Sequence, residues 1–182
     1  GIDFPGMITD AIRCVRRGAY RHPYKYVLID EYQDMSRPRY ELIRALREQS
    51  DFTLFCVGDD WQSIYRFAGS DIHLILDFAD IWRDWGPTRM FQITTTRRFR
   101  QSLIDASGAF VMQDKSLYAK QLRNPSDKKD YSLKALGGAT QEERFDAIVE
   151  QLRKLPKAAS VLMLGRYRSD LNLLSRNDRD GL

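Results

Sequence analysis

The chain has 182 residues, 43% of them hydrophobic, so it can bury the core of one domain or two small ones, and this composition excludes a disordered chain. Its 29 Lys and Arg residues against 25 Asp and Glu residues give a net charge of +4, which permits nucleic-acid binding without requiring it. No apolar run approaches the ~18 residues of a membrane span, and the first residues, "GIDFPG", lack the basic and apolar regions of a secretory signal. We therefore expect a soluble, cytoplasmic protein.

The cysteines and histidines are spread along the chain without the spacing of a metal site. Cys56 lies inside the apolar run "TLFCV", and we expect both Cys56 and Cys14 to be buried free thiols of a reducing compartment. Since His22 and His73 are the only histidines, the sequence disfavours a zinc site.

The first half of the chain alternates amphipathic segments with short apolar runs. Residues 5–18 place apolar side chains on one helical face and end in a glycine, which predicts a helix. The run 26–29 predicts a strand buried on both faces, because its apolar residues do not alternate with polar ones. Residues 36–49 predict a helix with Ser36 as its N-cap, and the run 52–57 predicts a second buried strand.

Acidic residues follow where each predicted strand ends. Asp30 and Glu31 follow the first strand, and Asp59 and Asp60 follow the second. The two acidic pairs are about 30 positions apart, which is the length of a strand, a crossover helix and a parallel strand. Because ligands bind at the carboxyl ends of strands in open α/β sheets, we expect these acids to be neighbours at the ligand-binding edge of the sheet.

The second half of the chain is less regular. The spacing of apolar residues predicts a helix over 72–82, and "RMFQIT" at 89–94 predicts a third strand of the parallel layer. Further elements are expected as follows: a helix near 101–113, a strand at 131–134, a helix near 141–154 and a strand at 160–165. We interpret the later elements as the start of a second α/β domain and divide the chain into domains 1–92 and 93–182.

An Asp followed by Glu at the end of a buried strand is the arrangement that nucleotide hydrolases need. Asp30 would order a hydrated Mg²⁺ on the phosphates, and Glu31 would accept a proton from the attacking water. The alternative is an acidic surface turn. The longer run "DEYQD" favours the catalytic interpretation, with Asp34 bracing the loop.

Two longer motifs indicate a family. "VLIDEYQD" resembles motif II of superfamily 1 DNA helicases of the UvrD and Rep type, and "VGDDWQSIYRFAGSD" resembles their motif III in order and distance. The segments "IDFPG", "TLFCVGDDWQSIYRFAG" and "TTTRRF" are most similar to the DNA helicase IV branch, and the resemblance weakens after about Asp114. It implies a RecA-like parallel sheet with flanking helices, the P-loop NTPase fold, in parts of two motor domains that use ATP and Mg²⁺.

The segment that resembles motif III joins an amide to two aromatic residues. Gln62 lies beyond the second predicted strand, where a neutral amide can bond the terminal phosphate or the attacking water. Tyr65 and Phe67 follow on the same loop, and aromatic faces stack on any base at ~1–3 kcal/mol each. The resemblance implies that Gln62 contacts the γ-phosphate and that Tyr65 and Phe67 line the single-strand track; core packing is the alternative for the two rings.

"TTTRRFRQS" resembles motif IV and places arginines at a helix start, where the dipole disfavours cations unless an anion binds. Arg98 matches the family arginine that reaches the γ-phosphate from the second domain. Arg97 stands where the family usually has an aromatic residue that stacks on adenine, and a guanidinium can also stack, so Arg97 is an ATP-binding candidate. Solvent-facing side chains are the alternative for these residues and for Arg100.

Two other positions bear on DNA contact. Ala68 stands where many relatives carry an arginine, so one link between nucleotide and DNA is missing or rerouted. Arg166 lies in "VLMLGRY", which resembles a later family segment, and is a DNA-binding candidate for a backbone contact, with a plain surface arginine as the alternative.

None of the eleven glycines is followed by Lys, so the phosphate-cradling loop GxxxxGK[ST] is absent from these residues. In the family that loop lies upstream of motif II, and motifs V and VI lie downstream of the matched segments. We therefore expect an internal part of an ATP-dependent 3′-to-5′ DNA helicase that acts on single-stranded DNA and duplex junctions. Glu31, Gln62 and Arg98 are its expected catalytic residues, Asp30 and Glu31 its metal site, and the 182 residues alone are expected to be inactive.

Two other classes of function remain open. One is a nucleic-acid-binding or regulatory module that keeps the helicase fold without turnover. The other is a nuclease with a two-metal cluster of acids, which leaves "QSIYRF" and the arginines unexplained. The cluster would comprise Asp30, Glu31, Asp34, Asp59 and Asp60. The sequence leaves the oligomeric state open.

Overall fold

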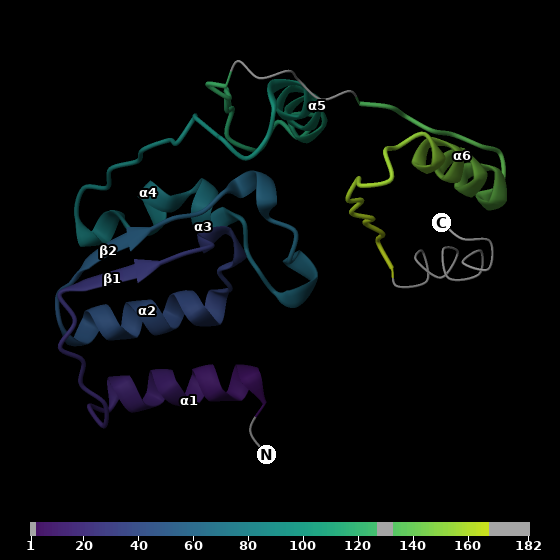
Figure 1. Ribbon diagram of the computed structural model, residues 1–182. Helices are drawn as coiled ribbons and strands as arrows, with labels where there is room; N and C mark the ends of the chain where they lie inside the picture. Colours follow the sequence, from purple (N-terminus) through teal and green to yellow (C-terminus); the bar gives the residue numbers. More distant parts are fainter. Residues whose placement is uncertain (1–2, 127–132, 168–182) are drawn as a thin grey trace. The chain divides into compact units, whose positions relative to one another are not determined.

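The computed structural model describes residues 3–126 and 133–167 (Figure 1). The chain forms two compact units, Gly1–Tyr131 and Ser132–Leu182, which are described separately below.

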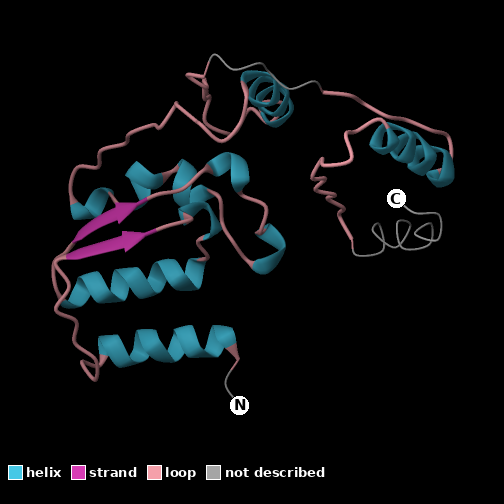
Figure 2. Cartoon of the chain, viewed as in Figure 1, coloured by secondary structure: helices cyan, strands magenta, loops and turns pink. Residues whose placement is uncertain are grey.

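A parallel pair of strands lies at the centre of the first unit. β1 (Tyr26–Ile29) pairs with β2 (Thr53–Cys56), with Ile29 opposite Cys56. The Val57 amide donates to the Ile29 carbonyl at 2.8 Å, which carries the ladder one step beyond β2. The two predicted strands and their parallel pairing are confirmed (Figure 2), so the acids that follow them lie at the same end of the pair.

The two long helices of this unit pack against each other. α1 (Phe4–Arg16) begins at Asp3, whose carboxylate accepts from the Gly6 amide at 2.8 Å. Its most buried residue is Val15, on the predicted apolar face. α2 (Arg37–Gln49) follows Ser36 as predicted and supplies the crossover between β1 and β2. α1 lies against α2, as Figure 1 also shows.

The core of the first unit lies beside the strand ends. Tyr32, Met35 and Leu74 form its buried centre, and Ile29 of β1 and Cys56 of β2 pack against them. The prediction of strands buried on both faces is wrong: alternate residues of β1 and β2 are exposed, for example 72% of Leu28. The cause is that only one face of the pair carries a packed layer within residues 3–126.

The predicted helix over 72–82 is broken into short pieces. α3 (His73–Leu76) and α4 (Phe78–Ile81) precede a 3₁₀ turn, Arg83–Trp85. The break follows Leu76, whose carbonyl accepts from the Tyr118 hydroxyl at 2.5 Å. Because Tyr118 lies 42 positions further along the chain, local periodicity gave no sign of this competing hydrogen bond.

The prediction of a third strand at 89–94 is also wrong. No ladder joins this segment to another strand in the described part of the unit, and Phe91 and Ile93 are more than 80% exposed. Instead, Thr94 accepts from the Arg123 amide at 2.9 Å at the end of the segment. The expected helix near 101–113 is present as α5 (Gln101–Val111).

The second unit contains α6 (Gln141–Arg153), which confirms the predicted helix and begins with a capping box between Thr140 and Glu143. Its described residues contain no strand: the prediction for 160–165 is wrong, and 133–134 are not strand either, while 131–132 lie outside the described residues. The reason is that a strand needs a hydrogen-bonded neighbour, and 82% of Leu162 is left exposed.

Both cysteines are free thiols, as predicted, but neither is fully buried: Cys14 on α1 is exposed, and Cys56 on β2 is half-buried. Over residues 3–126 and 133–167, no helix has both the length and the apolar character needed to cross a membrane.

Candidate nucleotide site

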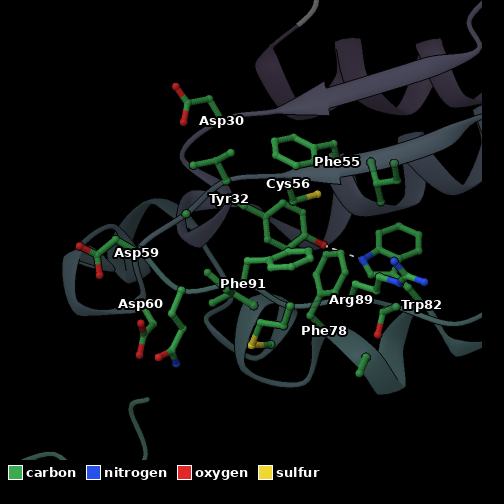
Figure 3. Close-up of a pocket in the computed structure, with 18 of the residues that line it drawn as sticks. Asp30, Tyr32, Phe55, Cys56, Asp59, Asp60, Phe78, Trp82, Arg89 and Phe91 are labelled. Atoms are coloured by element: carbon green, nitrogen blue, oxygen red, sulfur yellow. Dashed lines mark hydrogen bonds between the residues drawn. The ribbon is translucent and has the colours of Figure 1, made fainter. Parts of the chain in front are cut away.

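A cavity of about 1350 Å³ opens at the carboxyl ends of β1 and β2 (Figure 3). Asp30, Glu31, Asp59 and Gln62 line it at the strand ends, and it continues along β2 beside the segment 86–94. The structure therefore brings together the acids and the amide that the sequence predicts to act on a nucleotide.

Glu31 has an unusual backbone conformation. Its φ of 50° is left-handed, and among the described residues it is the sole non-glycine with positive φ. Such a conformation costs about 1–3 kcal/mol and persists where the surrounding structure imposes it. Here the Glu31 amide donates to Asp30 Oδ1 at 2.9 Å, and both residues of this tight turn line the cavity at the end of β1.

Gln33 connects the two strand ends. It is 2% exposed; its Nε2 donates to Glu31 Oε2 at 2.7 Å, and its Oε1 accepts from the Asp59 amide at 3.0 Å. Sequence reasoning missed this residue, although an amide two positions after the proposed base in "DEYQD" was an available signal. Gln33 holds the carboxylate of Glu31 and the start of the loop after β2 in a fixed relation.

Asp59 lies between an amide and an ammonium. Its Oδ2 accepts from Gln62 Nε2 at 2.6 Å, and its Oδ1 lies 2.5 Å from Lys120 Nζ. Burial raises the pKa of Asp59, but the hydrogen bonds from Lys120 and Gln62 outweigh it, so the net pKa lies below its ordinary value. Asp59 therefore carries its negative charge at neutral pH.

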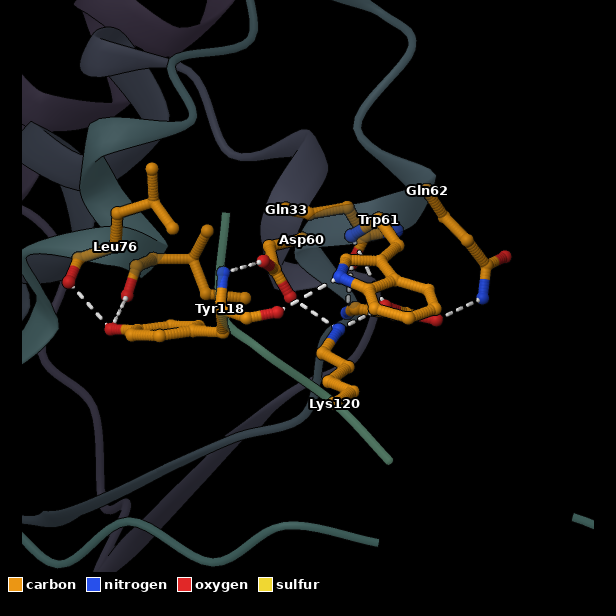
Figure 4. A network of polar contacts seen from close by, with 9 residues as sticks. Gln33, Asp60, Trp61, Gln62, Leu76, Tyr118 and Lys120 are labelled. Carbon is orange, nitrogen blue, oxygen red and sulfur yellow. Dashed lines mark hydrogen bonds and ion pairs between the residues drawn. The ribbon is translucent and has the colours of Figure 1, made fainter. Parts of the chain in front are cut away.

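Asp60 completes a polar network with the segment that follows α5 (Figure 4). It is 3% exposed, pairs with Lys120 and accepts from the Tyr118 amide at 2.8 Å. Trp61 donates its indole N–H to the Tyr118 carbonyl at 3.0 Å, and Lys120 Nζ lies 5.1 Å from the Trp61 ring centroid. Lys120 was not predicted, since nothing near it in the sequence marks it.

The aromatic pair of the same loop faces solvent. Tyr65 is 46% exposed and Phe67 is 87% exposed, with their ring centroids 5.9 Å apart. Neither ring packs into a core. The loop returns at Asp71, whose carboxylate pairs with Arg37 at 2.5 Å and whose amide donates to the Met35 carbonyl at 2.8 Å. This anchor presents the two rings on an exposed turn.

Arg97 and Arg98 do not join the acids of the cavity. Arg97 and Arg98 are exposed, precede α5 and are not among the residues that line the cavity. Arg100 is the residue before α5 and donates to Ser126 Oγ at 2.5 Å. Arg166 belongs to the second unit, where its guanidinium lies 5.4 Å from the ring centroid of Tyr167.

The carboxylates at the strand ends fit a single hydrated magnesium ion better than the two-metal cluster of a nuclease. Mg²⁺ usually keeps several waters and binds through one or two carboxylates and the substrate phosphates, which Asp30 and Glu31 can provide. Within the described residues, no three Asp, Glu, His or Cys side chains gather to hold a metal. Asp59 and Asp60 instead share an ion pair with Lys120, so the five-acid nuclease cluster has no support from the geometry.

Paired parallel strands with carboxylates and an amide at their carboxyl ends place this chain among α/β proteins, which bind ligands at that edge of the sheet. Residues 2–81 match the family model of the UvrD/REP helicase N-terminal domain. The chain belongs to this family of UvrD-type helicases, which confirms the resemblance found in its motifs.

The chain is also similar to curated helicases. It is 35% identical over 170 residues to DNA helicase IV of Escherichia coli, covering 91% of this chain and 24% of that protein. It is 35% identical over 132 residues to the ATP-dependent DNA helicase UvrD1 of Mycobacterium tuberculosis, covering 66% of this chain and 17% of that protein. It is 29% identical over 131 residues to the ATP-dependent DNA helicase PcrA of Bacillus subtilis, covering 69% of this chain and 17% of that protein. The chain thus spans less than a quarter of the length of these relatives.

Proposed function

We propose that the chain is part of an ATP-dependent DNA helicase, one that couples hydrolysis of Mg·ATP to 3′-to-5′ movement along single-stranded DNA and to duplex unwinding. The observation that carries the proposal is the single cavity in which Asp30, Glu31 and Gln62 lie at the ends of two paired parallel strands. The names of the relatives, which are DNA helicases, support DNA as the substrate.

Each residue of the cavity has a role in this proposal. Asp30 holds the hydrated Mg²⁺, which supplies positive charge to the phosphates when it is bound. Glu31 accepts the proton of the attacking water, and its hydrogen bond with Gln33 keeps its carboxylate in place. Gln62 bonds the terminal phosphate or the water.

The remaining assignments concern the second motor domain and DNA. We assign residues 1–92 and 93–182 to parts of two RecA-like motor domains, with Arg98 reaching the γ-phosphate and Arg97 stacking on the base. Tyr65 and Phe67 stack on bases of a single strand, which their exposure allows, and Arg166 contacts the DNA backbone. The partners are single-stranded DNA and duplex junctions, and such a motor acts in the cytoplasm.

The test is phosphate release from ATP, with and without single-stranded DNA, by the longest polypeptide that contains this chain. We expect DNA to stimulate this polypeptide, whereas the 182 residues alone stay inactive because they lack the phosphate-cradling loop. Glu31→Gln should bind ATP and DNA while kcat falls by about 100-fold or more. Glu41→Gln, an exposed change on α2, is the matched control, and normal turnover by Glu31→Gln would refute the role of Glu31.

A second candidate function is a binding module that keeps the fold without turnover. It is favoured by Arg97, which stands exposed where the family usually has a base-stacking aromatic residue. If the longest polypeptide binds single-stranded DNA but releases no phosphate from ATP, this candidate replaces the motor.

A further inference from the structure

Lys120 joins the acids after β2 although it lies 61 positions beyond Asp59 in the sequence. Its side chain is 16% exposed, and it pairs with both Asp59 and Asp60, whose side chain is 2% exposed. Water screens the attraction between such charges less than it does on an open surface. The ammonium therefore fixes the position of the Asp59 carboxylate.

The Asp59 carboxylate in turn decides which way the Gln62 amide faces. An ionised carboxylate only accepts hydrogen bonds, so Asp59 Oδ2 must face the NH₂ group of Gln62 rather than its oxygen. At 2.6 Å this contact leaves Gln62 Oε1 and one N–H directed away from Asp59. These are the atoms that can bond a water or a phosphate oxygen at the cavity, which Gln62 also lines.

The segment that carries Lys120 is itself fixed to the same loop. Tyr118 donates its amide to Asp60 and accepts from Trp61, and its hydroxyl donates to the Leu76 carbonyl. In Figure 4 the Tyr118 amide lies beside Asp60 and Lys120, while the Tyr118 hydroxyl points the other way, to Leu76. Since the segment follows α5, a displacement of α5 and of this segment would separate Lys120 from Asp59.

We propose that Lys120 is a positioning residue, which sets the orientation of the Gln62 amide through Asp59. This inference rests on the proposed function, in which Gln62 bonds the terminal phosphate or the attacking water. It makes Lys120, Asp59 and Gln62 one relay, through which the segment after α5 controls the amide at the nucleotide.

The test measures kcat and KM for ATP separately in the longest polypeptide that contains this chain, at saturating single-stranded DNA. Lys120→Met and Asp59→Asn should each lower kcat by about 10-fold or more and leave KM within about 2-fold. The double variant should lose no more than the worse single variant, because the relay acts as a unit. Lys120→Arg should restore most of kcat, and Lys115→Met, an exposed change nearby, should have no effect.

Asp59→Asn guards the test against simple unfolding, because it keeps the buried pair of Lys120 and Asp60. Its thermal midpoint should fall by no more than about 4 °C, because only the half-exposed partner of Lys120 loses its charge. If Lys120→Met unfolds, the kcat of Asp59→Asn decides between the outcomes. Unchanged kcat in Asp59→Asn, an effect on KM alone, or multiplying losses in the double variant would overturn the inference and leave the proposed function standing. A wild type without DNA-stimulated ATP hydrolysis would overturn both.

Discussion

The hydrogen bond between Trp82 and Tyr32 is buried in the core beside the nucleotide cavity. Trp82 Nε1 donates to the Tyr32 hydroxyl at 2.9 Å, and the two residues are 2% and 1% exposed. Tyr32→Phe keeps the ring and its edge contact with Phe78, with centroids 5.4 Å apart, but leaves the indole N–H without an acceptor. An unpaired buried donor costs about 1–3 kcal/mol, so we expect the free energy of unfolding to fall by that amount.

Urea unfolding of the 182-residue chain, followed by tryptophan fluorescence, measures this change. With a slope of about 2 kcal/mol per molar urea, the midpoint should fall by roughly 0.5–1.5 M at an unchanged slope. The control is Tyr65→Phe, which removes a hydroxyl from a ring that is 46% exposed and should change stability by less than about 0.5 kcal/mol. Equal midpoints for the two variants would refute the reasoning, because the Tyr32 hydroxyl would then contribute no more than an exposed one.

Two other predictions concern pH and DNA. Burial raises the pKa of the Cys56 thiol to about 12, against about 8.5 in an unfolded chain, so stability should be full below pH ~8.5 and fall by about 1.4 kcal/mol per pH unit above it. Cys56→Ala should abolish this slope in urea unfolding between pH 7.5 and 10, whereas Cys14→Ala, at an exposed thiol, should keep it; a slope that survives in Cys56→Ala contradicts the assignment. Phe67→Ala should weaken binding of single-stranded DNA by about 5- to 150-fold in fluorescence anisotropy without loss of stability, because the ring is 87% exposed. Phe110→Ala, at a ring 73% exposed on α5, is its control, and equal affinities would remove Phe67 from the DNA track.

The elements that sequence predicted correctly are those whose signals are local. α2 begins after Ser36 and shows helical periodicity throughout, and the residues of β1 and β2 form compact apolar runs. The segment 89–94 also contains apolar residues but forms no strand, because a strand needs a ladder partner as well, and the Thr94 carbonyl bonds the Arg123 amide instead. The break after Leu76 has a similar origin, since the hydroxyl that donates to the Leu76 carbonyl belongs to the distant residue Tyr118.

The candidate site divides in the same way. Asp30, Glu31 and Gln62 could be named from motifs, since each lies within a few positions of a predicted strand end. The left-handed backbone of Glu31 and the contact of Lys120 with Asp59 could not, because both depend on how the loops after β1, β2 and α5 meet.

The hydrogen bonds of the two strand ends form one continuous path. Glu31 accepts from Gln33, Gln33 accepts from the Asp59 amide, and the Asp59 carboxylate accepts from Gln62. The parallel register fixes the spacing of the two strand ends, so the side chains need only short reaches to connect them. The proposed proton acceptor and the proposed phosphate sensor therefore cannot reorient independently: a movement of Gln62 that pulls on Asp59 also moves the partner of Gln33, and hence the carboxylate of Glu31. In such a site, Lys120 at the far side of Asp59 sets the resting position of the whole path, because Asp59 is the member that both halves share.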